Sequence, residues 1–245
     1  MPSQTDQRRD KGPEISFYVE QATNLTTGAM LSDAKVVRKF GATMSEHEGE
    51  RDAEAASEVR HRTANTLQLL ATLARMRGQK TSDLEARRQM TWMAEAIGAL
   101  GALERRRSGD TVDFAAYLEE MAQVWRRRQA GRAVEVLVEV DDLKIRDQAA
   151  STLALITNEL VGNALTHGLI GAEARLIRIT LRQESGGMAR LIVADGGPGF
   201  DPAAAAGRER FGLWLARSLA GQVRGDLSLG RGPNGGIRAQ LTFPV

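Results

Sequence analysis

Two short stretches of this chain carry polar residues where a buried element would carry apolar ones. In the first, LALITNELVGNALTHG (153–168), Glu159, Asn163 and His167 lie four residues apart and share one face of an expected helix. Asn suits a helix interior poorly, because its amide competes for backbone hydrogen bonds. A carboxylate and an amide oxygen on one face suit a hydrated Mg²⁺ ion. An exposed polar stripe or a satisfied core amide explains them equally well.

The second stretch is LIVADGGPGF (191–200). A buried apolar run ends in Asp195, and glycines follow at 196, 197 and 199 around Pro198. Many Asp-Gly turns share this pattern, so it is weakly specific by itself.

In this order and spacing the two stretches resemble the ATP site of the GHKL superfamily. ELVGNALTHG resembles its Asn box and DGGPGF its Asp-x-Gly-x-Gly box. RFGLWLARSLAGQVRG (210–225) resembles the Gly-x-x-Leu region after the ATP lid, and GGIRAQLTFP resembles the closing strand. This resemblance covers roughly Thr111 to Val245.

The resemblance implies a role for each polar residue. Asn163 would hold Mg²⁺ on the phosphates of ATP, and Glu159 would help to hold the ion or its water. Asp195 would accept a hydrogen bond from the adenine amino group.

The glycines have implied roles too. Gly197 and Gly199 would let the backbone approach the nucleotide. Gly212 would begin a helix whose N–H groups face phosphate.

Two departures from the superfamily pattern favour weak or lost ATP binding. Gly236 is followed by Ile237 where a Thr is usual, and the lid DPAAAAGRER is short, with only Arg208 and Arg210 as obvious phosphate partners.

Composition narrows the function classes. The chain has 245 residues, enough for one or two domains. A net charge of +2 and an aromatic content of 4% argue against a nucleic-acid partner. The absence of Cys excludes disulfides and thiolate chemistry. No signal peptide or membrane span is recognisable, so we expect a cytoplasmic protein with no membrane contact.

A helical hairpin is expected ahead of the ATP-binding region. From about Ser45 to Gly78 an apolar seam follows a heptad pattern, and after the break GQKTSD a second helix runs from about Leu84 to Arg106. Two such hairpins would bury their stripes as a four-helix bundle of two chains. Alternatively, the hairpin packs on the rest of its own chain. The seam residues are Ala56, Val59, Thr63, Thr66, Leu70 and Leu73, and the second stripe is Met93, Ala96, Leu100 and Leu103.

The remaining pattern predicts an α+β fold, in which the antiparallel hairpin is followed by a two-layer α/β sandwich. The expected domains are a poorly defined segment (1–44), the hairpin (45–108) and the ATP-binding domain (109–245). A linker SGDTVD ends in the helix N-cap Asp113. Helices are expected over 114–128, 149–166 and 211–223, and strands over 134–140, 175–183, 190–194, 226–229 and 237–243.

His61 points away from the seam, in EVRHRTANTLQLL. This segment resembles the phosphoacceptor box of histidine kinases in which Arg follows the His and Asn stands four residues after it. The match lies with relatives of the HWE group, because Asn158 rather than His precedes Glu159. The resemblance implies that His61 accepts a phosphoryl group, that Asn65 orients the γ-phosphate or a water, and that Arg62 offsets phosphate charge.

The leading hypothesis is therefore a homodimeric histidine kinase that uses Mg²⁺ and ATP to phosphorylate His61 and serves a response-regulator receiver domain. A partner protein or the N-terminal segment would supply its signal. A non-catalytic phosphotransfer or scaffold protein with a degenerate ATP domain is the runner-up. A GHKL serine kinase acting as an anti-sigma switch is the third hypothesis.

Overall fold

The structure is a computed structural model that describes residues 34–128, 134–169, 175–199, 211–232 and 235–245, with side chains from Glu54 onward. The chain divides into two compact units, Met1–Glu54 and Ala55–Val245. Apart from the first part of helix α2, the features described below lie in the second unit. Most of the predicted N-terminal segment (1–44) lies outside the described residues. No helix of the described part of the chain is long and apolar enough to cross a membrane.

The predicted hairpin is present as α2 (Ala34–Lys80) and α3 (Leu84–Glu104). Its helices meet through small residues. A Cβ built on Gly78 would lie 3.0 Å from the Cβ of Met90, and one on Gly101 would lie 3.4 Å from the Cβ of Leu67. Asp83 caps α3 by accepting a hydrogen bond of 2.7 Å from the backbone N–H of Ala86.

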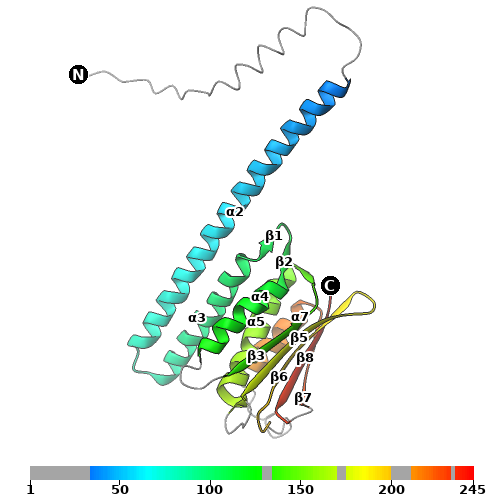
Figure 1. Ribbon diagram of the computed structural model, residues 1–245. Coiled ribbons are helices and arrows are strands. Elements are labelled where there is room, and N and C mark those ends of the chain that lie inside the picture. Colours follow the sequence, from blue (N-terminus) through cyan, green and yellow to red (C-terminus); the bar gives the residue numbers. More distant parts are fainter. Residues whose placement is uncertain (1–33, 129–133, 170–174, 200–210, 233–234) are drawn as a thin grey trace, which may run out of the picture. The chain divides into compact units, whose positions relative to one another are not determined.

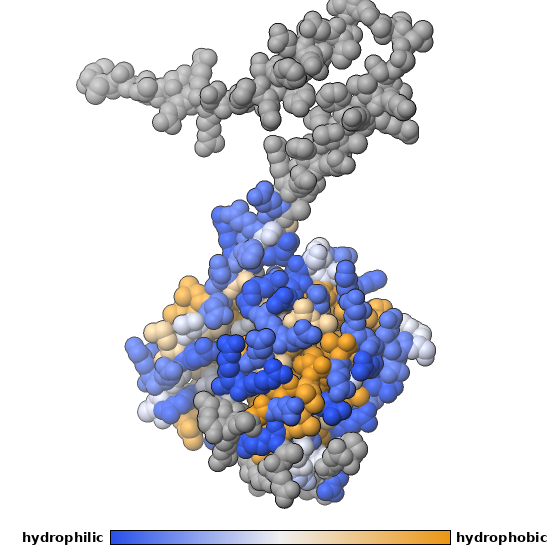
Figure 2. Space-filling model, viewed as in Figure 1, coloured by the Kyte–Doolittle hydropathy of each residue, from blue (hydrophilic) through white to orange (hydrophobic). Residues whose placement is uncertain are grey.

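The predicted heptad seam of α2 faces away from α3. Val59, Leu70 and Leu73 are 63%, 46% and 52% exposed. Figure 2 shows hydrophobic residues at the surface of the hairpin among polar ones. This seam therefore has no partner among the described residues of the chain.

A small three-stranded sheet connects the hairpin to the following domain. It is formed by β1 (Arg107–Ser108), β2 (Thr111–Asp113) and β4 (Lys144–Arg146), in the order β1-β2-β4. The predicted linker is therefore partly strand, and β4 was not predicted. Val112 and Ile145 pair in this sheet and are both buried. Strands of two and three residues are too short for a detectable alternation.

Two helices lead into the site. Helix α4 (Phe114–Arg128) begins after Asp113, which caps it as predicted through a bond of 2.9 Å from the Ala116 N–H. After β3 (Glu135–Val140), helix α5 (Asp147–Asn163) starts two residues earlier than predicted. It continues as one π-helical turn, η2 (Ala164–Gly168).

The main sheet has five strands in the order β3-β5-β6-β8-β7, and only β3 and β5 are parallel. Helices α4, α5 and α7 cover one face of it (Figure 1), which confirms the predicted two-layer sandwich. The remaining elements are β5 (Leu176–Glu184), β6 (Met188–Asp195), α7 (Phe211–Gln222), β7 (Asp226–Arg231) and β8 (Ile237–Pro244).

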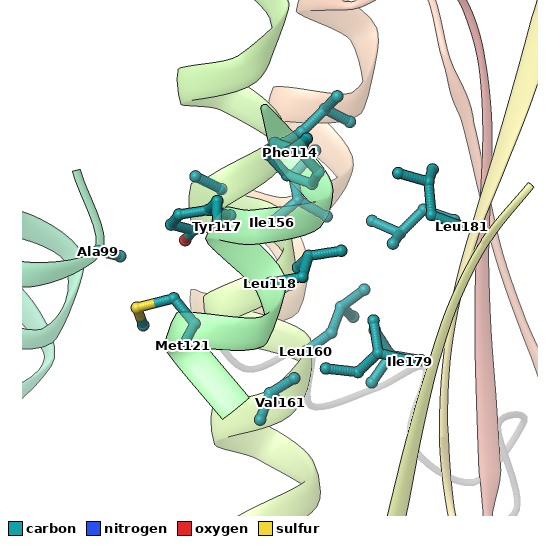
Figure 3. Close-up of a cluster of buried hydrophobic side chains, with 14 of the residues drawn as sticks. Ala99, Phe114, Tyr117, Leu118, Met121, Ile156, Leu160, Val161, Ile179 and Leu181 are labelled. Atoms are coloured by element: carbon teal, nitrogen blue, oxygen red, sulfur yellow. The ribbon is translucent and has the colours of Figure 1, made fainter. Parts of the chain in front are cut away.

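The core joins the sheet, α5, α4 and α3. Ile179 and Leu181 point from β5 toward Ile156 and Leu160 of α5 (Figure 3). On the far side of α4, Ala99 of α3 belongs to the same buried cluster. The predicted stripe of α3 is thus partly buried on its own chain: Ala96 and Leu103 are buried, whereas Met93 is 42% exposed.

The cap of α4 gives a direct stability test. Asp113→Ala should lower the free energy of unfolding by about 1 kcal/mol, because the Ala116 N–H loses its acceptor. Urea denaturation measures the change. Asp113→Asn keeps a capping oxygen and should stay close to wild type; equal losses in both variants would contradict the capping role.

Candidate active site

The C-terminal end of α5 carries the predicted polar pair. Asn163 donates from its side-chain nitrogen to Oε1 of Glu159 at 2.9 Å, and both side chains are half-buried. The two residues therefore share one face, as their spacing predicted. His167 lies in η2 and is exposed. The chain reaches His167 through a π turn rather than through a continuous α-helix.

The π turn brings the end of α5 against β6. Burial alternates along β6, so that Asp195 follows Leu191 and Val193 on the core-facing side of the strand. Asp195 is only 9% exposed. Its Oδ1 accepts a hydrogen bond of 3.0 Å from the Gly197 N–H, and Oδ2 accepts none from the residues that the structure describes. A buried carboxylate with one vacant oxygen suits a hydrogen-bond donor on a ligand.

Three glycines surround Asp195. A Cβ on Gly168 would lie 2.7 Å from its carboxyl carbon, and one on Gly236 would lie 2.0 Å from its backbone oxygen. A Cβ on Gly197 would lie 1.6 Å from the carbonyl oxygen of Gly168. Three backbone segments thus meet at a separation that no side chain allows. Sequence analysis identified Gly197 but gave no role to Gly168 or Gly236.

The other predicted glycines have different constraints. Gly199 has a φ of +75°, a left-handed conformation that favours glycine. Gly212 lies in the first turn of α7, where a Cβ would come within 1.6 Å of Oε1 of Glu159. This close approach to Glu159 explains the glycine and places the start of α7 beside the polar pair.

Sequence analysis missed the second partner of Glu159. Trp92 of α3 donates from its indole nitrogen to Oε2 of Glu159 at 2.7 Å. A residue of the helical hairpin therefore reaches the polar pair. Nothing in the apolar periodicity of α3 distinguishes Trp92 from a packing residue.

Asn158, one residue earlier, is a satisfied core amide. It is 4% exposed, and its oxygen accepts hydrogen bonds of 3.3 Å from Trp125 and from Arg128. Arg128 also pairs with Glu95 of α3 at 3.1 Å. Burial raises the pKa of Glu95 despite the opposing charge of Arg128, and burial lowers the pKa of Arg128.

His61 and Asn65 lie on α2 with exposed side chains, and no described contact joins either residue to Glu159, Asn163 or Asp195. Arg62 forms an exposed ion pair of 2.5 Å with Glu58, one turn earlier on the same helix. The structure thus assembles the predicted ATP-site residues but not the predicted phosphoacceptor with them.

The residues fit a magnesium ion that arrives with phosphates rather than a closed protein site. No group of three or more His, Asp or Glu side chains in the described ranges could hold a metal ion. Asn163 makes its described hydrogen bond through nitrogen, so its amide oxygen has no described donor. One amide oxygen and one carboxylate suit Mg²⁺, which keeps several waters and binds through substrate phosphates. The lid, with Arg208 and Arg210, lies outside the described residues.

Two family models match this chain. One, described as histidine kinase, covers residues 58–128, which include His61. The other, described as histidine kinase-, DNA gyrase B-, and HSP90-like ATPase, covers residues 148–245. The chain therefore contains a histidine kinase domain followed by an ATPase domain of the histidine kinase, DNA gyrase B and HSP90 type. Glu159, Asn163 and Asp195 all lie within the ATPase match.

Curated relatives agree with this family. The chain is 26% identical over 196 residues to the sensor histidine kinase PdtaS of Mycolicibacterium smegmatis, covering 77% of this chain and 39% of that protein. It is 24% identical over 200 residues to blue-light-activated histidine kinase 1 of Erythrobacter litoralis, covering 78% and 52%. The chain thus spans about half or less of the length of these relatives.

Solved structures support the fold. The histidine kinase domain of the Erythrobacter litoralis EL346 blue-light-activated kinase aligns with a TM-score of 0.59 at 18% identity, covering 77% of this chain and 93% of that one. The longer structure of the same kinase aligns at 0.60 and 22% identity, covering 78% and 59%.

The glycine contacts predict a position-specific defect. Gly197→Ala should destabilise the fold by about 1–3 kcal/mol, because its Cβ meets a backbone oxygen that cannot move aside. Gly221→Ala in α7 is the control, since a Cβ there meets nothing within 4 Å and should stabilise the helix by roughly 0.5–1 kcal/mol. Chemical denaturation measures both; a Gly197→Ala protein as stable as wild type would refute the close packing.

Proposed function

We propose that this chain phosphorylates His61 from Mg²⁺-bound ATP and passes the phosphoryl group to an aspartate of a response-regulator receiver domain. The observation that carries the proposal is the buried residue Asp195 at the end of β6, which lies against Gly168, Gly197 and Gly236 and whose Oδ2 accepts no hydrogen bond from the described residues. A buried acceptor in that position suits the amino group of adenine. Glu159 and Asn163 lie together on α5, where they would serve the phosphate end of the nucleotide.

The chemistry at His61 needs exposure and a neutral imidazole. The side chain is exposed on α2, so a ring nitrogen can approach a phosphate from solvent. That nitrogen attacks the γ-phosphorus, an N–P bond forms, and the P–O bond to ADP breaks. Mg²⁺, when bound, would neutralise phosphate charge. Asn163 and Glu159 would hold it, and Asn65, one turn from His61, would orient the γ-phosphate or a water.

The exposed seam of α2 supports a homodimer. Val59, Leu70 and Leu73 form an apolar stripe on the side that α3 leaves open. The seam threonines suit burial, because Thr63 and Thr66 donate their hydroxyls to backbone oxygens of their own helix. We therefore assign 45–108 to dimerisation and phosphotransfer and 109–245 to ATP binding. A partner protein would supply the signal.

The scaffold alternative keeps one observation in its favour. Ile237 opens β8 where the superfamily has a hydroxyl, so the adenine end lacks one polar contact. Measured ATP binding separates this alternative from a kinase. The match of 58–128 to a histidine kinase model disfavours the serine-kinase hypothesis.

Labelling from γ-labelled ATP tests the phosphoacceptor. The wild-type chain should acquire acid-labile, base-stable label that His61→Ala abolishes without loss of ATP binding. His47→Ala, another histidine of the same helix, is the matched control and should keep the label. Asn163→Ala should lose label because Mg²⁺ is no longer held. Label that survives in His61→Ala, or that is acid-stable, would refute the assignment.

A second test addresses Asp195. Asp195→Asn can keep the bond from Gly197 while presenting an amide donor in place of Oδ2, so ATP affinity should fall about tenfold or more. Calorimetric titration with an ATP analogue measures the change, and Asp226→Asn, an exposed position on β7, is the control. Unchanged affinity in Asp195→Asn would exclude the adenine contact.

A further inference from the structure

Trp92 connects the dimerisation hairpin to the proposed phosphate end of the ATP site. Both oxygens of Glu159 are engaged: Oε1 accepts from Asn163 at 2.9 Å, and Oε2 accepts from the indole N–H of Trp92 at 2.7 Å. Hydrogen bonds to a carboxylate are about twice as strong as neutral ones. The orientation of Glu159 is therefore set partly by α3.

The hairpin register shows where this contact lies relative to His61. Gly78 faces Met90, and Gly101 faces Leu67, so His61 lies level with Arg107, just beyond the end of α3. Trp92 stands about 15 residues before that point, which is roughly 20 Å along the hairpin at 1.5 Å per residue.

The pairing of α3 with α5 gives the same offset. At one end, Arg107 forms an ion pair with Asp147, the first residue of α5. At the other end, Trp92 holds Glu159. His61 is thus level with the start of α5, whereas Asn163 ends the helix. With 17 residues, α5 is about 25 Å long.

We propose that the Trp92–Glu159 hydrogen bond is a latch that holds the kinase in an autoinhibited, docked state, from which phosphoryl transfer requires release of the ATP-binding domain. This inference rests on the proposed function. In the docked state the phosphate end of the site lies about 20 Å along the hairpin from His61. If a second copy of the chain packs alongside with its hairpin parallel, its His61 lies at the same level, so the distance along the hairpin is the same.

Several features of the interface between α3 and the ATP-binding domain favour release. Helix α3 contributes one large buried side chain, Leu103, and otherwise mainly small ones, Ala94, Ala96, Ala99 and Ala102, each of which buries little apolar area. The Glu95–Arg128 pair is desolvated in the interface, and such pairs contribute little net stability. The buried hydroxyl of Tyr117 has no partner among the described residues, which also disfavours docking. The stability of the docked state therefore depends strongly on the polar contact of Trp92.

The test uses Trp92→Phe in the full chain, which keeps an aromatic ring but removes the N–H donor. Two quantities are measured: hydrogen–deuterium exchange of α3 without nucleotide, and the initial rate of His61 labelling from ATP. We expect faster exchange over 84–104 and a labelling rate about tenfold higher, the factor that one charge-assisted hydrogen bond shifts an equilibrium. Gln89→Ala is the control. It removes a bond of 2.9 Å to Glu85 within α3 that does not reach the ATP-binding domain.

A charge swap provides a second, independent variant. Glu95→Arg should repel Arg128 and mimic Trp92→Phe, and Glu95→Arg combined with Arg128→Glu should restore slow exchange and slow labelling. Thermal unfolding confirms that each variant is folded.

The outcomes separate the two proposals. Unchanged exchange in Trp92→Phe overturns the latch whatever the labelling rate. Faster exchange with slower labelling overturns autoinhibition, because Trp92 would then position Glu159 for catalysis. If wild type takes up no label, the proposed function fails, and exchange alone decides whether Trp92 holds the docked state.

Discussion

The structure depends on the burial of α5 between the sheet and the hairpin. Leu153, Ile156 and Leu160 face the sheet, while α3 packs on the other side. A helix covered on both sides cannot leave polar side chains unpaired, because an unsatisfied buried group costs about 1–3 kcal/mol. Two buried polar residues of α5 accordingly have partners: Thr157 donates to the Leu153 carbonyl, and Asn158 accepts from Trp125 and Arg128.

This constraint explains how one helix serves both the core and the site. Its apolar residues fix its position against β5 and β6, and the π turn that follows it ends at Gly168, which lies against Asp195. Close approach of Gly168, Gly197 and Gly236 then replaces side-chain packing around the carboxylate. The site is therefore made largely of backbone, and its shape depends on the absence of Cβ atoms.

The two helices of the hairpin make different contacts. Helix α3 shares its small residues with α2 and with the ATP-binding domain, and the three arginines at its end pair with acidic residues: Arg105 and Arg106 with Glu120, and Arg107 with Glu104 and Asp147. Helix α2 presents an apolar seam on its open side. Helix α3 in turn contacts Glu159 of α5 through Trp92.

The sequence by itself determined most of the helices and strands and the sandwich, because helical periodicity and strand alternation are local signals. It also predicted the polar residues that we propose for the ATP site. Glu159 and Asn163 were correctly placed on one face, since four-residue spacing in a helix does not depend on the rest of the fold. The π turn at the end of α5 and the strands β1, β2 and β4 were not predicted, because contacts between distant segments decide them.

Only the tertiary structure decided which segments meet. Gly168 and Gly236 are needed because three backbone segments meet at Asp195. The spacing of these glycines along the chain does not indicate that they meet. Likewise, Trp92 and Glu159 are 67 positions apart and belong to different predicted domains. Periodicity marks which face of a helix is buried, but the docking of two faces fixes which side chain meets which.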